Sequence, residues 1–129
     1  MKSILAFVFA LGIFHSCAQE KQTVTEIGAD SMKTMITGEH AVILDVRTPE
    51  EYAQGHIPGA INIDYQNEKF SAGLDTLNRD LEYHVYCRSG RRSGESVEIM
   101  KQKGFTKIYH LQGGILEWEE KGYPVKKEE

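Results

Sequence analysis

The feature that most constrains the fold of this chain is an alternation of short, branched apolar runs with stretches of helical periodicity. Residues 41–46, AVILDV, form a near-continuous apolar run, as expected for a strand that is buried on both faces of a sheet. Strands that alternate with helices need crossover connections and therefore pair in parallel. We expect an α/β fold, a three-layer α/β/α sandwich around a mainly parallel sheet of about five strands.

Local signals place the individual elements. A helix is predicted to begin after Thr48, which can cap it, with Pro49 at its first position and the acids Glu50 and Glu51 at the positive end of its dipole. Gly55 is expected to end this helix. The other predicted strands are residues 60–63, 83–87 and 107–111, and the other predicted helices are residues 66–77, 93–103 and 115–121.

The first residues indicate an export signal and not a part of the domain. After Lys2, the run from Ile4 to Phe14 contains 11 apolar residues without a break. A helix of that length covers about 16 Å, which is too short for a hydrocarbon core of ~30 Å. The apolar part of a signal peptide has ~7–15 residues, so residues 1–16 are predicted to be a signal peptide.

The end of this signal has two interpretations. Residues 14–17, FHSC, resemble a bacterial lipobox, which predicts that Cys17 is lipidated, becomes the first residue of the mature chain and anchors an exported protein at the periplasmic side of a membrane. Ordinary cleavage after Ala18 would instead give a soluble periplasmic protein. We favour the lipobox because it explains a cysteine where the apolar run ends. The expected mature organisation is a polar tether at 17–23, a domain at 24–126 and a charged tail at 127–129.

Charge and cysteine content exclude several kinds of function. The chain has 15 Lys and Arg against 19 Asp and Glu, a net charge of −4, which disfavours nucleic acid as a partner because phosphate binding needs a basic surface. Two cysteines cannot build a disulfide framework. If Cys17 carries lipid, Cys87 is the one remaining thiol, and no zinc-site spacing exists. We therefore expect no metal and no cofactor.

The strongest functional signal is the sequence CRSGRRS, which begins at Cys87. A cysteine at the carboxyl end of a strand, followed at once by a helix, lies where backbone N–H groups of the loop and the first helical turn converge. Arg88, Arg91 and Arg92 add positive potential with no acid among them. Both effects favour the thiolate, so we expect the pKa of Cys87 to lie below the ~8.5 of a free cysteine.

This loop closely resembles the active-site loop of single-domain rhodaneses, the thiosulfate sulfurtransferases. Residues 44–62, LDVRTPEEYAQGHIPGAIN, are similar to a second signature of that family, D-V-R followed by E-[YF] and G-H-I-x-G-A. The segment with Gly104-Phe105, LQGG at 111–114 and Trp118 resembles the usual closing segment. The resemblance runs from about residue 24 to 126, which is essentially the whole expected domain.

The resemblance implies sulfur transfer by covalent catalysis. The Cys87 thiolate would attack the outer sulfur of thiosulfate or a similar small anionic donor, expel sulfite and leave a persulfide. A second nucleophile, cyanide or a thiol, would then take that sulfur. Backbone amides of the loop would surround the terminal sulfur, and any of its arginines could hold the sulfonate end of the donor. The substrate-binding residues implied in this way are Arg88, Ser89, Gly90, Arg91 and Arg92.

Asp45 and Arg47 match the D-V-R signature and end a strand at the same edge of the sheet as the cysteine. A role at the pocket is one reading. We favour a structural role, in which Arg47 pairs with Glu50 or Glu51 and locks the following turn. His56 is expected to pack or to form hydrogen bonds, because persulfide transfer from an existing thiolate needs no general base.

Two other functions stay open. Phosphatases and arsenate reductases related to this fold use a loop C-x5-R, which would require an arginine at the position of Ser93, whereas Arg92 lies at C-x4-R. The smaller ring of amides suits a single sulfur atom better than a phosphoryl group. Alternatively, Cys87 could belong to a persulfide or redox relay module that serves a protein partner, which would use the same loop and differ only in its acceptor.

Overall fold

A computed structural model describes residues 12–13 and 21–129 of the protein. The predicted signal peptide, Cys17 and most of the predicted tether lie outside these residues. In the described part, the strands are β1 (Thr23–Ile27), β2 (Ala41–Asp45), β3 (Ile61–Asn62), β4 (Glu82–Tyr86) and β5 (Lys107–Leu111). The helices are α1 (Ala29–Met35), α2 (Pro49–Gln54), α3 (Phe70–Asp75), α4 (Arg91–Gln102) and α5 (Gly114–Glu120).

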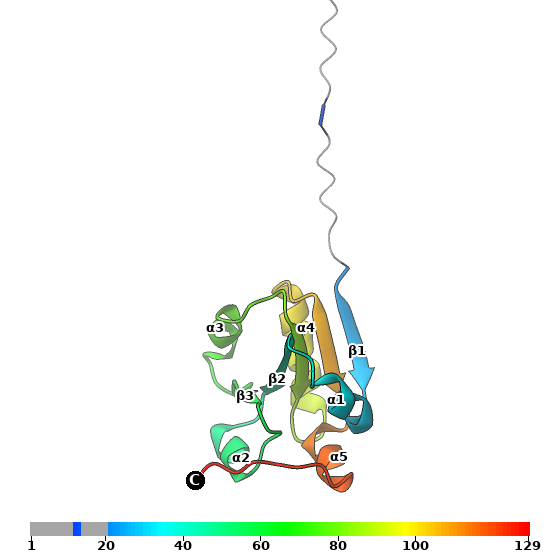
Figure 1. Cartoon of the computed structure of the whole chain (residues 1–129). Coiled ribbons are helices and arrows are strands. Elements are labelled where there is room, and N and C mark those ends of the chain that lie inside the picture. Colours follow the sequence, from blue (N-terminus) through cyan, green and yellow to red (C-terminus); the bar gives the residue numbers. More distant parts are fainter. Residues whose placement is uncertain (1–11, 14–20) are drawn as a thin grey trace, which may run out of the picture.

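The strands form one sheet with the order β1-β5-β4-β2-β3, and every neighbouring pair is parallel. Helices cover both faces of this sheet (Figure 1), which confirms the predicted three-layer α/β/α sandwich. Because all strands run in the same direction, the loops that follow β2 and β4 meet at the carboxyl edge of the sheet.

The core consists of two hydrophobic clusters, one on each face of the sheet. Successive residues of a strand point to opposite faces, so Tyr83 and Val85 join the cluster that contains α3 and α4, while Tyr86 joins the one that contains α1 and α5. In β2, Leu44 likewise belongs to the cluster with α3 and α4, and Ile43 to the cluster with α1 and α5. Burial on both faces explains why the central strands are near-continuous apolar runs in the sequence.

The helix predicted at 66–77 is shorter in the structure, where α3 begins only at Phe70. Two turns precede it. The carboxylate of Asp64 accepts a hydrogen bond from the Gln66 amide at 2.9 Å, and the side chain of Asn67 accepts one from the Lys69 amide at 2.8 Å. Side chains that bind the backbone two residues ahead favour turns over helix, which explains the late start.

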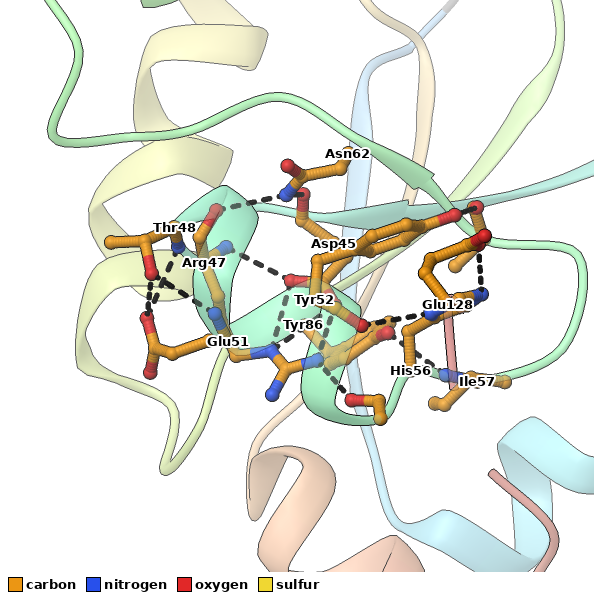
Figure 2. Close-up of polar contacts among 12 residues, drawn as sticks. Asp45, Arg47, Thr48, Glu51, Tyr52, His56, Ile57, Asn62, Tyr86 and Glu128 are labelled. Carbon is orange, nitrogen blue, oxygen red and sulfur yellow. Dashed lines mark hydrogen bonds and ion pairs between the residues drawn. The ribbon is translucent and has the colours of Figure 1, made fainter. Parts of the chain in front are cut away.

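The C-terminal residues pack against α2. Lys126 and His56 exchange two backbone hydrogen bonds of 2.9 and 2.8 Å, and the Glu128 amide donates to the Ala53 carbonyl at 3.0 Å. The His56 ring stacks on Tyr52 with 3.7 Å between ring centroids. Figure 2 shows Tyr52, His56 and Glu128 together beside α2. This segment therefore helps to fix the helix that follows β2.

Among residues 12–13 and 21–129, no helix combines the length and apolar character that a membrane crossing requires.

Candidate active site

Cys87 is the first residue beyond the carboxyl end of β4. The next helix, α4, begins at Arg91 and not at Ser93 as predicted, so the connecting loop consists only of residues 88–90. Because the loop is this short, its backbone N–H groups and those of the first turn of α4 surround the same small space.

The Cys87 sulfur receives hydrogen bonds from the loop and from the helix. The Gly90 amide donates to Sγ at 3.1 Å, and the Ser93 hydroxyl donates to it at 3.2 Å. Burial of the thiol raises its pKa, but hydrogen bonds from Ser93, Gly90 and Ser89 outweigh this effect and hold the pKa of Cys87 below its ordinary value. The direction agrees with the sequence-based expectation, in which backbone N–H groups were one of two causes. The hydroxyl of Ser93 is an additional donor, and Arg92 also interacts electrostatically with Cys87.

Backbone amides at the start of α5 form hydrogen bonds with the carbonyl groups of this loop. The Ile115 amide donates to the Cys87 carbonyl at 2.9 Å, and the Leu116 amide donates to the Arg88 carbonyl at 3.2 Å. These bonds draw the carbonyls of the loop outward, which leaves its amides free to face the sulfur. The approach requires Gly114, whose φ is +63° and where a Cβ would collide with the Arg88 carbonyl.

Gly90 is required for a similar reason. Its φ of +105° lies in the left-handed region, and a Cβ would collide with the carbonyl oxygen of Gln112. The glycine thus allows the loop to turn sharply and to press against the segment before α5. Its own amide, which points at Sγ, depends on this turn.

Arg92 is engaged in an ion pair. Its guanidinium donates to the two carboxylate oxygens of Glu51 at 2.7 and 2.9 Å, which lowers the pKa of Glu51 to about 2. The same carboxylate accepts from the amide and hydroxyl of Thr48, both at 3.1 Å, in the capping box of α2. Arg92 therefore clamps α4 to α2, and two of its donors are unavailable to a ligand in this arrangement.

Arg88 and Arg91 are the freer cations at the site. A cavity of about 380 Å³ is lined by Cys87, Ser89 and the three arginines of the loop. Arg91 is 72% exposed and reaches only a long contact of 3.5 Å with Glu95. Arg88 has no acidic partner among the described residues and also lines a second cavity of about 230 Å³. An anion in the first cavity would thus meet two guanidiniums near a sulfur nucleophile.

Asp45 and Arg47 form a buried pair beside the second cavity (Figure 2). Nη2 of Arg47 lies 2.6 Å from Oδ2 of Asp45 and donates to the Gly55 carbonyl at 2.7 Å, and the two residues are only 5% and 0% exposed. The expectation that Arg47 pairs with Glu50 or Glu51 is wrong, because the Glu51 carboxylate turns back to its own helix start and to α4. The pair ties the end of β2 to the end of α2.

A chain of polar contacts leads from the sulfur through Ser93 and His110 to Glu26, and the sequence did not predict it. Ser93 Oγ lies 2.6 Å from Nε2 of His110, and Nδ1 of His110 lies 2.7 Å from a carboxylate oxygen of Glu26. The alternation within residues 107–111 could have placed the His110 ring on the same face of the sheet as Ile108. No local signal links it to Glu26, which lies 84 positions earlier in the chain.

In the described ranges, 12–13 and 21–129, no group of three or more His, Cys, Asp and Glu side chains could hold a metal ion.

Comparisons with known proteins agree with this geometry. A family model described as "Rhodanese-like domain" matches residues 28–121. The chain is 32% identical over 103 residues to a sulfurtransferase of Allochromatium vinosum, covering 79% of this chain and 94% of that protein. It is 33% identical over 116 residues to a putative sulfur carrier protein of Bacillus subtilis, covering 89% of this chain but only 61% of that protein.

The solved structures include similar domains. A rhodanese-related protein from Thermoplasma volcanium superposes with a TM-score of 0.71 at 35% sequence identity, covering 79% of this chain and 97% of the other. The family match spans most of the chain, the fold is shared, and the loop after β4 carries the cysteine. The chain therefore belongs to the rhodanese-like domain family.

Proposed function

We propose that this protein transfers sulfane sulfur through a persulfide on Cys87. The observation that carries the proposal is the position of Cys87 Sγ, which lines an arginine-bearing cavity and accepts hydrogen bonds from Gly90 and Ser93. These bonds favour a thiolate, which is the form of cysteine that attacks sulfur. The names of the relatives, a sulfurtransferase and a putative sulfur carrier, support the same chemistry.

In the proposed first half-reaction, the Cys87 thiolate attacks the outer sulfur of thiosulfate. A sulfur–sulfur bond forms to Cys87, the bond between the outer sulfur and the sulfonate breaks, and sulfite leaves with the electron pair. Arg88 and Arg91 hold the sulfonate oxygens. The donors that solvate the thiolate, the Gly90 amide and the Ser93 hydroxyl, then stabilise the negative persulfide.

In the second half-reaction, cyanide or a thiolate attacks the outer sulfur of the persulfide and Cys87 leaves as a thiolate. A persulfide relay that delivers sulfur to a partner protein is a second candidate, because one relative is named as a putative sulfur carrier. It differs from the first only in the acceptor. A phosphatase is less well supported, because Arg92 is bound to Glu51 and does not stand free to hold a phosphoryl group.

The test of the proposal is intact-mass spectrometry with excess thiosulfate, combined with an assay of sulfite. The protein is the full chain with Cys17→Ser, which leaves Cys87 as its one thiol, and the control adds Cys87→Ser. We expect a gain of one sulfur atom only where Cys87 is present, with an equal amount of sulfite released. A folded, reduced protein that gains no sulfur would overturn thiosulfate as the donor.

The acceptor is identified in a second step. The persulfide form is isolated, and its loss is timed with cyanide, a small thiol and a protein dithiol. Fast loss to cyanide or the small thiol supports a free-standing sulfurtransferase. Fast loss to the protein dithiol alone supports the relay.

We also propose that the chain is exported and anchored at the periplasmic side of a membrane through lipid on Cys17. The support is in the sequence alone, the apolar run of residues 4–14 followed by FHSC. Labelling of bacterial cells that express the chain with a radioactive fatty acid should mark the protein, and Cys17→Ser should abolish the label. A labelled Cys17→Ser variant, or an unlabelled parent chain, would contradict the proposal.

A further inference from the structure

We propose that Ser93, His110 and Glu26 form a proton relay that keeps Cys87 ionised, so that His110 and Glu26 are positioning residues for the nucleophile. The inference rests on the proposed function in one respect, that the Cys87 thiolate is the reacting group.

The relay joins four side chains in series through three contacts. Ser93 Oγ lies 3.2 Å from Cys87 Sγ, 2.6 Å from Nε2 of His110, and Nδ1 of His110 lies 2.7 Å from Oε2 of Glu26. Cys87 directly follows β4 and Glu26 lies in β1, and these two strands flank β5, the strand of His110. Ser93, in the first turn of α4, bridges the sulfur and the imidazole.

The protons balance in both states of the relay. With a neutral thiol, Cys87 donates to Ser93 Oγ, Ser93 donates to Nε2 of His110, and Nδ1–H of His110 donates to Glu26. On ionisation, the thiol proton moves to Ser93 Oγ while the hydroxyl proton of Ser93 moves to Nε2. The sulfur becomes negative and the imidazole positive, and the Ser93 hydroxyl, whose oxygen lies 3.2 Å from Sγ, now donates to the sulfur.

The imidazole of His110 is buried, so its positively charged form requires a negatively charged partner. Ser93 is fully buried and the His110 side chain is 6% exposed, so a charged ring at this place needs an opposite charge in contact. Glu26 provides it, and because its side chain is 52% exposed, it keeps the far end of the relay in contact with solvent. A carboxylate that accepts from Nδ1–H also fixes the tautomer of the ring, so that Nε2 faces Ser93.

Four charged side chains line the cavity beside Cys87, those of Glu51, Arg88, Arg91 and Arg92. Of these, Arg92 of α4 interacts electrostatically with Cys87. Its guanidinium is held by Glu51 on the α2 side of the site. It therefore contributes a fixed positive charge and cannot exchange a proton with the thiol. The contacts through Ser93 and His110 to Glu26 offer a route by which a thiol proton can be taken up.

The test measures the ionisation of Cys87 directly, without any sulfur donor. In the full chain with Cys17→Ser, the rate of alkylation of Cys87 by iodoacetamide is followed against pH, and its midpoint gives the pKa of the thiol. The decisive variant is Glu26→Gln, which keeps the size of the side chain and removes its charge. The matched control is Glu82→Gln, which removes the same charge from the start of β4, where Glu82 contacts Lys107 at 3.6 Å.

We expect Glu26→Gln to raise the midpoint by about one unit, a tenfold loss of alkylation rate below the midpoint, and Glu82→Gln to leave it unchanged. His110→Gln should raise it at least as far. An unchanged midpoint in Glu26→Gln overturns the relay, and so does an equal shift in Glu82→Gln, which would indicate a general charge effect. Since Glu26 is exposed, its variant should fold, which thermal unfolding verifies.

The proposal and the proposed function can fail separately. If the protein forms no persulfide but the midpoint of Cys87 alkylation depends on Glu26, the result supports the relay and contradicts sulfur transfer. If the protein forms the persulfide but the midpoint of alkylation is the same in all variants, the result supports sulfur transfer and contradicts the relay.

Discussion

Replacement of Gly90 by alanine tests how tightly the loop around Cys87 is built. Gly90 has a φ of +105°, and a Cβ there would collide with the backbone oxygen of Gln112. The left-handed conformation disfavours alanine by about 1–2 kcal/mol. Displacement of a packed backbone adds about 1–3 kcal/mol. The free energy of unfolding should therefore fall by about 2–5 kcal/mol in Gly90→Ala.

Gly59→Ala is the matched control. Gly59 also has a positive φ, +85°, but nothing lies within 4 Å of a Cβ built on it. This variant should lose only the dihedral contribution of about 1–2 kcal/mol. The difference between the two variants isolates the collision with Gln112.

The assay is urea unfolding of the full chain and both variants, with the alkylation rate of Cys87 as a second readout. Gly90→Ala should also slow alkylation near neutral pH, because the Gly90 amide that donates to Sγ at 3.1 Å must move with its residue. Equal losses of unfolding free energy in Gly90→Ala and Gly59→Ala would refute the reasoning. So would an alkylation rate unchanged in Gly90→Ala.

Three further predictions concern buried or paired charges. His84 is fully buried, neither ring nitrogen has a hydrogen-bond partner in the described part of the chain, and burial lowers its pKa. The free energy of unfolding should therefore show no loss from His84 above the ordinary histidine pKa of ~6.5 and should decrease as the pH falls below it. Urea unfolding of His84→Leu should lack this decrease. Asp45→Asn leaves the Arg47 guanidinium buried without a counter-charge and should lower the unfolding free energy by about 3–5 kcal/mol; a loss below about 1 kcal/mol in the same assay would contradict this. Glu51→Gln removes the charged partner of Arg92. The lowered pKa of Glu51 corresponds to about 3 kcal/mol by linkage and the partial exposure of the pair reduces this value, so the unfolding free energy should fall by about 1–3 kcal/mol. Because the pKa of Glu51 is lowered to about 2, the difference in unfolding free energy between Glu51→Gln and the parent chain should be full above about pH 4.5. It should disappear as the pH falls through about 2.

Elements that depend on local signals were predictable from the sequence. The helix after Thr48 begins and ends as expected, since its capping box, its proline and its terminal glycine are all within a few residues of each other. The strand at 107–111 matches β5. The loop after Cys87 was also identified, because the cysteine, the glycine and the arginines are adjacent in the sequence.

The pairing of charges was not predictable in the same way. Arg47 has several acids nearby in the sequence, and its charge alone does not distinguish Asp45 from Glu51. The choice depends on the direction of side chains after folding. Likewise, Glu26 and His110 become neighbours only because β1 and β5 pair in one register, in which Glu26 lies opposite His110. That register is a property of the assembled sheet.

The common direction of the strands also determines how the domain faces its surroundings. The described chain enters the sheet at Thr23, the amino-terminal end of β1, whereas Cys87 lies beyond the carboxyl end of β4. A strand of five residues spans about 16 Å. The end of the sheet at which the described chain enters and the end that carries the sulfur are therefore opposite each other. A segment that leads into β1 joins the domain at the edge remote from Cys87, so it leaves the cavity at the sulfur accessible to dissolved anions and to the thiols of other proteins.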